Sequence, residues 1–408
     1  MDRRKFLSVA GGGVGAAAAG GLLLNTGCSG KKENTLKIVS SLPRTGSAQG
    51  QTDTIVNGIK LAIDEYGGEI AGMKLQHLDK DDATAAQGQW DAGKEADNAR
   101  EAVSDKDVMV VIGPYNSGAA KVSMPILNEA GLLQISPAAT WPGLTKPVPG
   151  LKNDEPQVYR PAGKITFCRV CPTDDTQGPL TARYIANELK AKSVYILDDK
   201  ELYGAGIAGL FKGECEKLGI KVLGHQSIVV SQQNFKGLMK EIGALKPDVL
   251  YFGGTTQSKG PQIAIDMKGE GLTCPLFVPD GCYEDAFIKA AGAEVLEGRV
   301  YATIGGKDPS QLTGPGAEFV KKYKEKYKSD PEAYSVYGYE AAKVFLEAVK
   351  KVGKKDREEI RKAVLATKDF EAGSLGKWSF NADGDTTLQV LTISKIEGGK
   401  FKPVKTQE

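Results

Sequence analysis

A repeated alternation of short apolar runs and amphipathic stretches constrains this chain most, and it starts at Leu36. Residues 36–40 predict a buried strand, and 51–66 predict a helix with Ile55, Ile59 and Ile63 on one face. The alternation runs on to residue 135, and a second series of the same kind runs from 194 to 303. Strands that alternate with helices form parallel sheets covered on both faces, so we predict an α/β fold.

Two lobes are expected, because single cores stop growing at about 250–300 residues and this chain has 408. A segment rich in proline and charge, Trp141 to Pro172, separates the two series. Each series predicts a doubly wound parallel sheet. In such sheets ligands bind beyond the carboxyl ends of the strands.

The N-terminus has the form of an export signal, with a charged start and a weakly apolar, Gly/Ala-rich stretch from Phe6 to Leu24. Arg3 and Arg4 resemble the pair of a twin-arginine signal. Cys28 follows Gly27 as in a lipoprotein cleavage site, although Asn25 occupies the position that usually holds Leu. We expect a signal peptide over residues 1–27 and lipidation of Cys28, with residues 28–34 as a tether. A plain signal peptide and an uncleaved anchor are the alternatives.

Charge and histidine content narrow the function classes. The segment up to Gly27 carries three of the 53 basic and one of the 51 acidic residues, so the remaining chain is close to neutral. That balance gives no reason to expect a nucleic-acid partner. Only His77 and His225 are present, which leaves metal sites and histidine-based catalysis poorly supplied. We expect no cofactor, no metal and no enzymatic activity.

For two motifs we prefer a structural interpretation over a functional one. The GxGxxG stretch Gly204–Gly209 lies too far from the preceding strand for a dinucleotide turn and is interpreted as a helix start packed on the sheet. Asp79, Asp81 and Asp82 lack the spacing of a calcium loop and are assigned to helix capping and solvation.

Five cysteines follow Cys28, an odd number in a compartment that permits disulfides. The pair Cys168 and Cys171 has redox or zinc spacing, but no second such pair or histidine lies nearby; a local disulfide or free thiols is expected. Cys274 and Cys282 flank one loop and offer another possible bridge. The sequence leaves the pairing of these residues and of Cys215 open.

Two strand ends carry the best candidate site. The buried run before Gly113 leads into Ser117 at a predicted helix start, where N–H groups and the helix dipole favour an anion. The run 132–135 ends in a loop with Ala138, Ala139 and Thr140. Two such ends side by side suit a carboxylate. No strong nucleophile, base or phosphate loop accompanies them, so the sequence indicates binding without chemical conversion.

Further candidates also follow predicted strands. Tyr203 and Thr255 come after strands of the second series, and Asp280 follows residues 276–278. A carboxylate at Asp280 can accept charge-assisted hydrogen bonds from an ammonium group. An ordinary turn aspartate before Gly281, and a Tyr203 that simply packs on its lobe, remain open.

These residues resemble a known family, the substrate-binding proteins of ABC transporters for branched-chain amino acids. The motifs that carry the resemblance are residues 112–120, 135–140, Asp175-Gln177-Gly178, Tyr203-Gly204, Phe252-Gly253-Gly254 and Pro279-Asp280-Gly281. The resemblance spans the chain after the leader. It implies the type I periplasmic binding fold, in which two doubly wound lobes are joined by a three-crossing hinge. Lobe 1 would hold residues 35–172 and 303–376, and lobe 2 residues 173–302 and 377–408.

The resemblance also implies roles. Ser117, Ala139 and Thr140 match residues that hold the α-carboxylate and α-ammonium of an amino acid, with Ala138 beside them. Tyr203 matches an aromatic wall of the pocket. Asp280 matches an acidic residue that pairs with the ammonium and is commonly Glu. Thr255 stands where aromatic residues often shape the pocket, which leaves the branched-chain preference open.

The expected function is therefore that of a monomeric, extracytoplasmic binding protein of the periplasm. It would capture an amino acid by hinge closure and deliver it to the membrane subunits of an ABC permease. A short amide, an aromatic acid or another organic acid is the alternative ligand. A ligand-sensing subunit for a membrane receptor is the alternative role.

Overall fold

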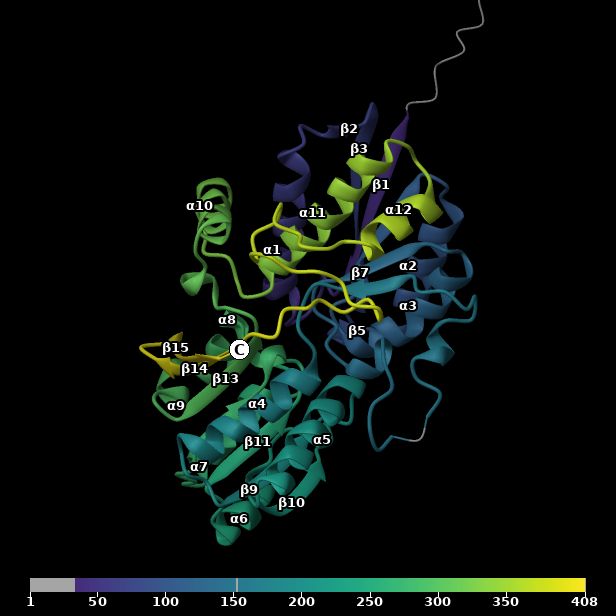
Figure 1. Cartoon of the computed structure of the whole chain (residues 1–408). Coiled ribbons are helices and arrows are strands. Elements are labelled where there is room, and N and C mark those ends of the chain that lie inside the picture. Colours follow the sequence, from purple (N-terminus) through teal and green to yellow (C-terminus); the bar gives the residue numbers. More distant parts are fainter. Residues whose placement is uncertain (1–33, 152, 408) are drawn as a thin grey trace, which may run out of the picture. The chain divides into compact units, whose positions relative to one another are not determined.

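The computed structural model describes residues 34–151 and 153–407, whose strands form two main sheets and a hairpin (Figure 1). The first sheet has the order β2-β3-β1-β6-β7-β8, and β1, β3, β6, β7 and β8 run parallel, as the alternation predicted. Its strands are β1 (Thr35–Leu42), β2 (Glu69–Ile70), β3 (Met73–Asp81), β6 (Val108–Ile112), β7 (Leu133–Ser136) and β8 (Phe167–Arg169). The hairpin consists of β4 (Ala83–Thr84) and β5 (Gln89–Trp90).

The second sheet has the order β10-β9-β11-β12-β13-β14-β15 and changes direction once β14 is reached. Strands β9 to β13 run parallel to one another. Strand β14 pairs antiparallel with both β13 and β15. The bounds are β9 (Ser193–Asp198), β10 (Lys221–Ser227), β11 (Val249–Gly253), β12 (Leu276–Val278), β13 (Val300–Gly305), β14 (Leu391–Glu397) and β15 (Lys400–Gln407).

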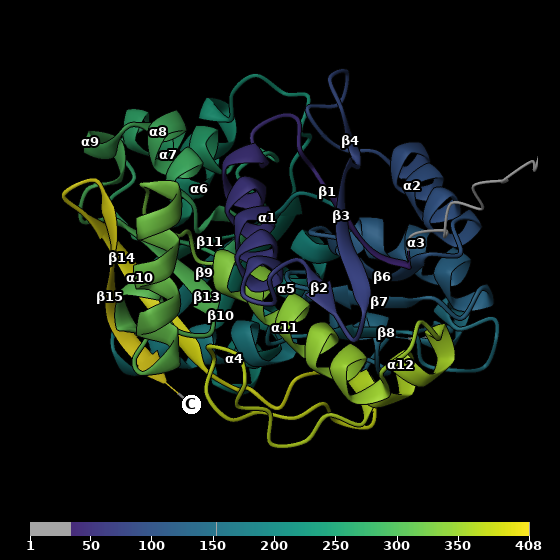
Figure 2. The ribbon, with the colours of Figure 1, turned by 90° about the horizontal axis from the view of Figure 1, so that it is seen from above.

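Helices from distant parts of the chain cover the first sheet. Figures 1 and 2 both place α11 beside α1, although they are far apart in sequence. The two helices approach closely at Gly58 and Gly338, where an added Cβ would lie 2.2 Å from the Ser335 carbonyl oxygen and 2.4 Å from that of Ile55. The helices of this group are α1 (Gln49–Asp64), α2 (Ala92–Ser104), α3 (Ser117–Glu129), α10 (Pro315–Tyr327), α11 (Ser335–Val352) and α12 (Arg357–Leu365).

The second group of helices packs around the second sheet. Helix α5 contacts β9, β10 and β11, and α4 lies against α5 and β13. These helices are α4 (Asp174–Asn187), α5 (Leu202–Lys217), α6 (Lys236–Leu245), α7 (Gly260–Gly269), α8 (Asp285–Ala291) and α9 (Ala293–Leu296). Short 3₁₀ turns occupy Pro142–Leu144, Gln157–Tyr159, Asp280–Cys282 and Pro309–Gln311.

The observed elements differ from the sequence-based prediction in several places, among them α8 and α9, which were not predicted. The segment 141–172, expected to interrupt the sheet, supplies β8 at its edge. Helix α4 was not predicted, because Gly178 and Pro179 lie inside it. Within the alternation predicted up to residue 135, helix α2 begins at Ala92, after β5, and its N-cap is Asp91, whose side chain accepts from the Lys94 N–H.

The structure also bears on the expected disulfides and on membrane-spanning helices. Within the part of the chain that the structure describes, all five cysteines are free, so the disulfide alternatives are wrong. No helix among residues 34–151 and 153–407 is long and apolar enough to cross a membrane. The predicted signal peptide with Arg3 and Arg4, and the lipidation of Cys28, fall outside the described residues.

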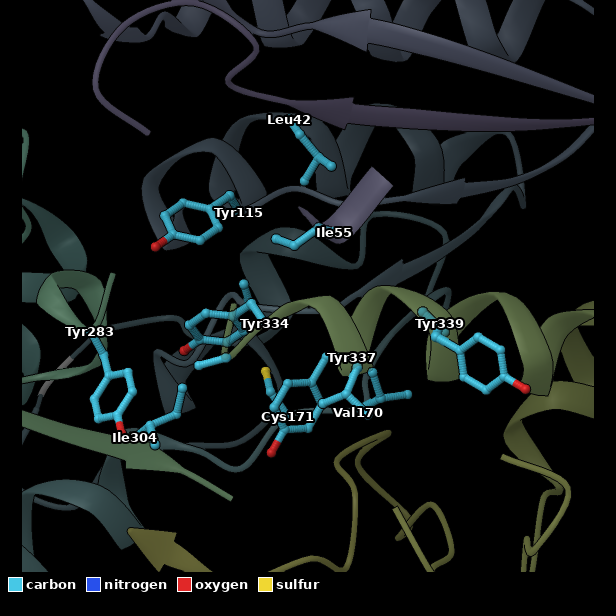
Figure 3. Close-up of a cluster of buried hydrophobic side chains, with 14 of the residues drawn as sticks. Leu42, Ile55, Tyr115, Val170, Cys171, Tyr283, Ile304, Tyr334, Tyr337 and Tyr339 are labelled. Atoms are coloured by element: carbon cyan, nitrogen blue, oxygen red, sulfur yellow. The ribbon is translucent and has the colours of Figure 1, made fainter. Parts of the chain in front are cut away.

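The division into lobes at 172/173, 302/303 and 376/377 stays a prediction. Aromatic side chains pack where the two groups of elements meet (Figure 3). Tyr115 follows β6 of the first sheet, and Tyr283 precedes α8 beside the second. Between the rings of this cluster and the sheet ends lies a small cavity.

Candidate ligand-binding site

The cavity is lined by the loops that follow strands of both sheets. Its free volume is ≈ 10 Å³, room for about one water molecule, and it is lined by Tyr115, Asn116, Ser117, Ala138, Tyr203, Thr255, Asp280 and Gly281. Five predicted site residues, Ser117, Ala138, Tyr203, Thr255 and Asp280, therefore meet at one place. The carboxyl ends of parallel strands bring them together, as expected for doubly wound sheets.

One wall is the turn that joins β6 to α3. Gly113 there has a φ of 144°, and a Cβ would lie 2.3 Å from the Ser41 carbonyl oxygen, so the turn requires glycine. Ser117 is the first residue of α3 and is 2 % exposed. Its hydroxyl accepts a hydrogen bond from the Trp141 N–H at 3.2 Å. The wall thus ends in a helix N-terminus, which favours a negatively charged group.

Ala139 and Thr140 lie beside this wall, buried and just outside the lining. The Ser136 hydroxyl accepts from the N–H groups of Ala138 at 3.2 Å and Ala139 at 2.8 Å. The N–H groups of Ala138 and Ala139 are therefore engaged within the loop. The Thr140 carbonyl accepts from the Asp174 N–H at 3.1 Å.

A fully buried arginine holds the same loop from behind. Nη1 of Arg169 donates to the carbonyls of Ala139 and Trp141, both at 2.8 Å, on either side of Thr140. Its Nε donates to Asp385 Oδ1 at 2.7 Å, and Nη2 donates to the Thr145 hydroxyl at 2.5 Å. Because all these donors are engaged, Arg169 fixes the loop and leaves the cavity without its charge.

The opposite wall carries Asp280, which is 3 % exposed. Its Oδ1 accepts from the Tyr203 hydroxyl and from Gln177 Nε2, each at 2.5 Å, and its Oδ2 accepts from the Tyr334 hydroxyl. The Tyr203 hydroxyl in turn accepts from the Gly281 N–H at 3.0 Å. Asp280 is thus a side chain held in place by three donors, not a solvated turn residue.

Thr255 contributes a methyl group to this wall. Its hydroxyl lies 3.0 Å from the Ser258 hydroxyl and accepts from the Ser258 N–H at 3.1 Å. Its Cγ2 lies 2.9 Å from where a Cβ on Gly281 would stand. Thr255 therefore presents an apolar surface at the position that the resemblance associates with aromatic residues.

Sequence reasoning missed several neighbours of the cavity. Tyr334, next to the start of α11, packs edge-on against Tyr115 with ring centroids 5.8 Å apart (Figure 3). Among the described residues, the Tyr115 hydroxyl and Asn116 Oδ1 are buried without a hydrogen-bond partner. Tyr334 is 54 residues from Asp280, its partner. No local pattern links two residues so far apart.

Burial sets the charges around the cavity. It raises the pKa of Asp280, against which the hydrogen bonds from Tyr203, Tyr334 and Gln177 favour the charged form. Burial also raises the pKa values of Tyr115, Tyr203 and Tyr334 well above the usual range, so these phenols stay protonated donors. The cavity thus joins a helix N-terminus at one wall to a buried carboxyl at the other.

Two motifs outside the site are settled by their contacts. Gly204 and Gly253 let α5 pack tightly on β11, since a Cβ on Gly204 would lie 2.6 Å from the Gly253 carbonyl; the interpretation as a packed helix start is confirmed. The capping and solvation assigned to the aspartate cluster is wrong. Asp79 and Asp81 accept from Arg44 Nε at 3.2 Å and the Arg44 N–H at 2.8 Å, and Asp82 is fully buried.

Comparison with known proteins places the chain in a family. Residues 35–400 match the periplasmic binding protein family. The chain belongs to this family. Members are binding proteins, in agreement with a cavity built from held, buried side chains. The Leu/Ile/Val-binding protein BraC3 of Rhizobium johnstonii is 30% identical over 364 residues, covering 88% of this chain and 91% of the relative. A Leu/Ile/Val-binding protein homolog of Brucella suis is 31% identical over 361 residues, covering 88% and 89%.

Solved structures of periplasmic binding proteins share the fold. The leucine-binding protein LivK of Thermotoga maritima has a TM-score of 0.80 at 24% identity, covering 91% of this chain and 98% of its own. A solute-binding protein of R. palustris in complex with benzoate has a TM-score of 0.76 at 22% identity, covering 91% and 96%. These likenesses confirm the predicted α/β fold of periplasmic binding proteins.

Proposed function

We propose that this protein is an extracytoplasmic substrate-binding protein that captures an aliphatic amino acid and delivers it to an ABC permease. The observation that carries the proposal is the polarity of the cavity. Ser117 at the start of α3, with Ala138 beside it, suits a carboxylate, and Asp280 on the opposite wall suits an ammonium. Thr255 and Tyr203 supply apolar surface between them. A zwitterion with a short apolar side chain matches this order of groups.

Closure of the two sheet domains on the ligand is the proposed mechanism. The lining comes from loops of both sheets, so a ligand that contacts both walls favours the closed form by its differential affinity. Exclusion of water strengthens the charged contacts in the closed site. A permease would then recognise the closed form. The hinge crossings proposed near 173, 303 and 377 would carry this motion.

Thermal unfolding against a panel of amino acids tests the proposal. A ligand at 100 times its Kd stabilises the folded protein by about 2.7 kcal/mol, which gives a visible rise in Tm. Leu, Ile or Val are expected to raise the Tm, and Asp280→Ala is expected to abolish the rise. If none of the amino acids shifts the Tm while an organic acid does, the amino-acid proposal is wrong.

One observation favours a second ligand class. The Asp280 carboxylate already accepts from Tyr203, Gln177 and Tyr334, so a ligand without an ammonium would leave these bonds undisturbed. A benzoate complex occurs among the solved relatives. Asp280→Asn distinguishes the classes: it is expected to weaken an amino acid strongly and an aromatic or other organic acid only slightly.

The proposal includes location and assembly. Export through the signal with Arg3 and Arg4, lipidation at Cys28 and a monomeric state are the arrangement we propose. Mass spectrometry of membrane fractions checks it, since a lipidated Cys28 adds acyl mass to the first peptide. Replacement of Cys28 by Ala is expected to release the protein from the membrane.

A further inference from the structure

A second buried acid lies behind Asp280 and has no assigned role. Asp174 is the first residue of α4 and is fully buried. The Gln177 Nε2 atom reaches both acids, at 2.5 Å from Asp280 Oδ1 and 3.5 Å from Asp174 Oδ1. Thr303 holds this amide in place by donating to Gln177 Oε1 at 3.0 Å. Two carboxyl groups are thus within reach of one nitrogen atom in a site closed to water.

The two acids differ in the donors available to them. Asp280 accepts hydrogen bonds from Tyr203, Tyr334 and Gln177, all of which stabilise its charged form. Asp174 Oδ2 has no hydrogen-bond partner of good geometry among the described residues, and the Thr140 hydroxyl beside it is a side-chain donor that favours the charged form of Asp174. The nearest cation, Arg169, directs its donors at Asp385, Thr145 and two carbonyl groups.

The cations around the pair are directed at other acids: Arg169 pairs with Asp385 at 2.7 Å, and Lys146 pairs with Asp175 at 2.8 Å. The negative charge of Asp175 raises the pKa of Asp174, and Arg169 lowers it in part from behind the loop. The remaining groups are phenols and thiols that burial keeps protonated: Tyr115, Tyr203, Tyr251, Tyr334, Tyr337, Cys171 and Cys282. Two like charges this close in a buried site cannot both form without a cation or a proton.

We propose that Asp174 carries a proton in the empty site and loses it when a ligand ammonium enters beside Asp280. This inference rests on the proposed amino-acid function. The ammonium keeps its own three protons and supplies the positive charge that the site lacks. The Asp174 O–H bond breaks, its proton passes to the buffer, and the two carboxylates then face one cation. Asp174 is thus a positioning residue: it adds negative charge near the ligand ammonium, and it is linked to Asp280 through the Gln177 amide.

Burial and the negative charge of Asp280 both favour the protonated form of Asp174 in the empty site. Burial raises the pKa of Asp174 well above its usual range, and the negative charge of Asp280 raises it further. A ligand that releases one proton binds about tenfold more tightly for each pH unit over the range in which Asp174 is protonated in the empty protein. Above that range the affinity is expected to level off.

Calorimetric titration of the purified protein with L-leucine tests this. Titrations from about pH 5 to about pH 9, in buffers with different ionisation enthalpies, count the protons released. Wild type is expected to release close to one proton per leucine at pH values between the pKa of Asp174 in the complex and its pKa in the empty protein, and none at the acid end, where Asp174 stays protonated in both. Asp174→Asn, which resembles the protonated acid, is expected to release none and to bind with an affinity independent of pH. The two proteins are expected to bind equally at low pH and wild type more tightly at high pH.

Three controls separate the effect of the Asp174 charge from an effect on folding. Asp175→Asn removes the adjacent, exposed acid and is expected to keep the wild-type proton release. Asp174→Asn is also titrated at the acid end, where binding equal to wild type demonstrates an intact site. 4-Methylpentanoate, which is leucine without its ammonium, is expected to release no proton from wild type.

The outcomes are distinguishable. Leucine binding with no proton release and a flat pH profile in wild type overturns the role of Asp174 and leaves the proposed function standing. Proton release that persists in Asp174→Asn also overturns it. If no amino acid binds and only acids without an ammonium do, the proposed function fails and this inference fails with it.

Discussion

The Asp280 carboxyl shows how single residues determine the chemistry of the cavity. Its donors come from three elements: Tyr203 from α5, Gln177 from α4 and Tyr334 from the residue before α11. Such hydrogen bonds to a charged group are shorter and stronger than neutral ones, and those from Tyr203 and Gln177, which lie beside the same sheet as Asp280, fix the carboxylate before the ligand arrives. A preorganised acceptor loses little entropy on binding.

Tyr334→Phe tests how much a single hydrogen bond to the Asp280 carboxylate stabilises the protein. The change removes one hydroxyl donor from a buried carboxylate, so we expect the free energy of unfolding to fall by about 1–3 kcal/mol. Urea unfolding measures it. Tyr195→Phe, whose hydroxyl makes only a long bond of 3.4 Å to Gln226, is the control and is expected to change stability by less than about 0.5 kcal/mol. Equal effects in both variants would contradict the role given to Tyr334.

Two further acids predict how stability depends on pH. Burial raises the pKa of Glu284 to about 8 and that of Glu332 to about 7. Because both values exceed the usual 4.5 of a glutamate, the folded protein binds more protons than the unfolded chain between these pH values. The stabilisation is full below about pH 4.5 and is lost as the pH rises through about 7 to 8. Buried Glu95 and Asp199, with pKa values of about 7, act in the same direction.

Glu284→Gln isolates one contribution to this pH dependence. The variant cannot ionise at position 284, so its Tm is expected to fall less than that of wild type between about pH 5 and about pH 8.5. Glu297→Gln, at an exposed position, is expected to retain the wild-type dependence. Parallel curves for wild type and Glu284→Gln would show that Glu284 is already ionised in the folded protein.

Some residues of the site could be predicted from the sequence and others could not. Ser117, Ala138, Tyr203, Thr255 and Asp280 follow strands directly, so strand ends and family resemblance together brought them into one prediction. Asp174, Gln177 and Tyr334 were not assigned, because what matters is their contact with Asp280, which lies 103 residues from Gln177 and 54 from Tyr334. Long-range packing carries that information, and no local pattern does.

At the scale of elements, close helix contacts depend on glycine. In α5, a Cβ on Gly206 would lie 2.4 Å from the Trp141 ring, whereas a Cβ on Gly209 would meet nothing within 4 Å. Trp141 belongs to the loop that carries Thr140, and its packing on α5 links that loop to the second sheet. The contact therefore joins the two walls of the cavity.

Gly206→Ala and Gly209→Ala form a matched pair on one helix. Alanine at 206 must displace the Trp141 ring, so we expect weaker ligand binding by about tenfold or more and a lower Tm. Alanine at 209 is expected to stabilise the helix by about 0.5–1 kcal/mol with unchanged affinity. Calorimetry and thermal unfolding measure both effects. Unchanged binding in Gly206→Ala would mean that the Trp141 contact does not support the closed site.

The elements also show where periodicity fails as a guide. Strands such as β6 and β11 are fully buried apolar runs, and they belong to the two alternating series that the sequence predicted. Helix α4 was missed because Gly178 and Pro179 are poor helix formers. Its position against α5 explains their tolerance, since a Cβ on Gly178 would lie 3.0 Å from the Phe211 nitrogen. Strand β8 has three residues, too few for a pattern.

At the scale of the whole molecule, the closed state depends on contacts across the cavity as well as on ligand. Gln51 in α1 donates to the Tyr283 carbonyl at 3.2 Å, and its Oε1 accepts from the Tyr334 N–H at 3.5 Å. The side chain thus ties a helix of the first sheet to the turn that follows Asp280. Such a bond favours closure whether or not the site is occupied.

Removal of that bond predicts a measurable shift between open and closed forms. Ligand-free wild type is expected to be more open than this structure, and L-leucine is expected to reduce the radius of gyration in small-angle scattering. Gln51→Ala lowers the closed fraction, so the apparent Kd rises in proportion to the loss of the competent form, by about 5- to 30-fold for 1–2 kcal/mol. Gln76→Ala, exposed on β3, is expected to match wild type in both measurements. A Gln51→Ala protein with wild-type affinity would show that closure is driven by the ligand contacts alone, since the bond to Tyr283 would then contribute nothing to the equilibrium.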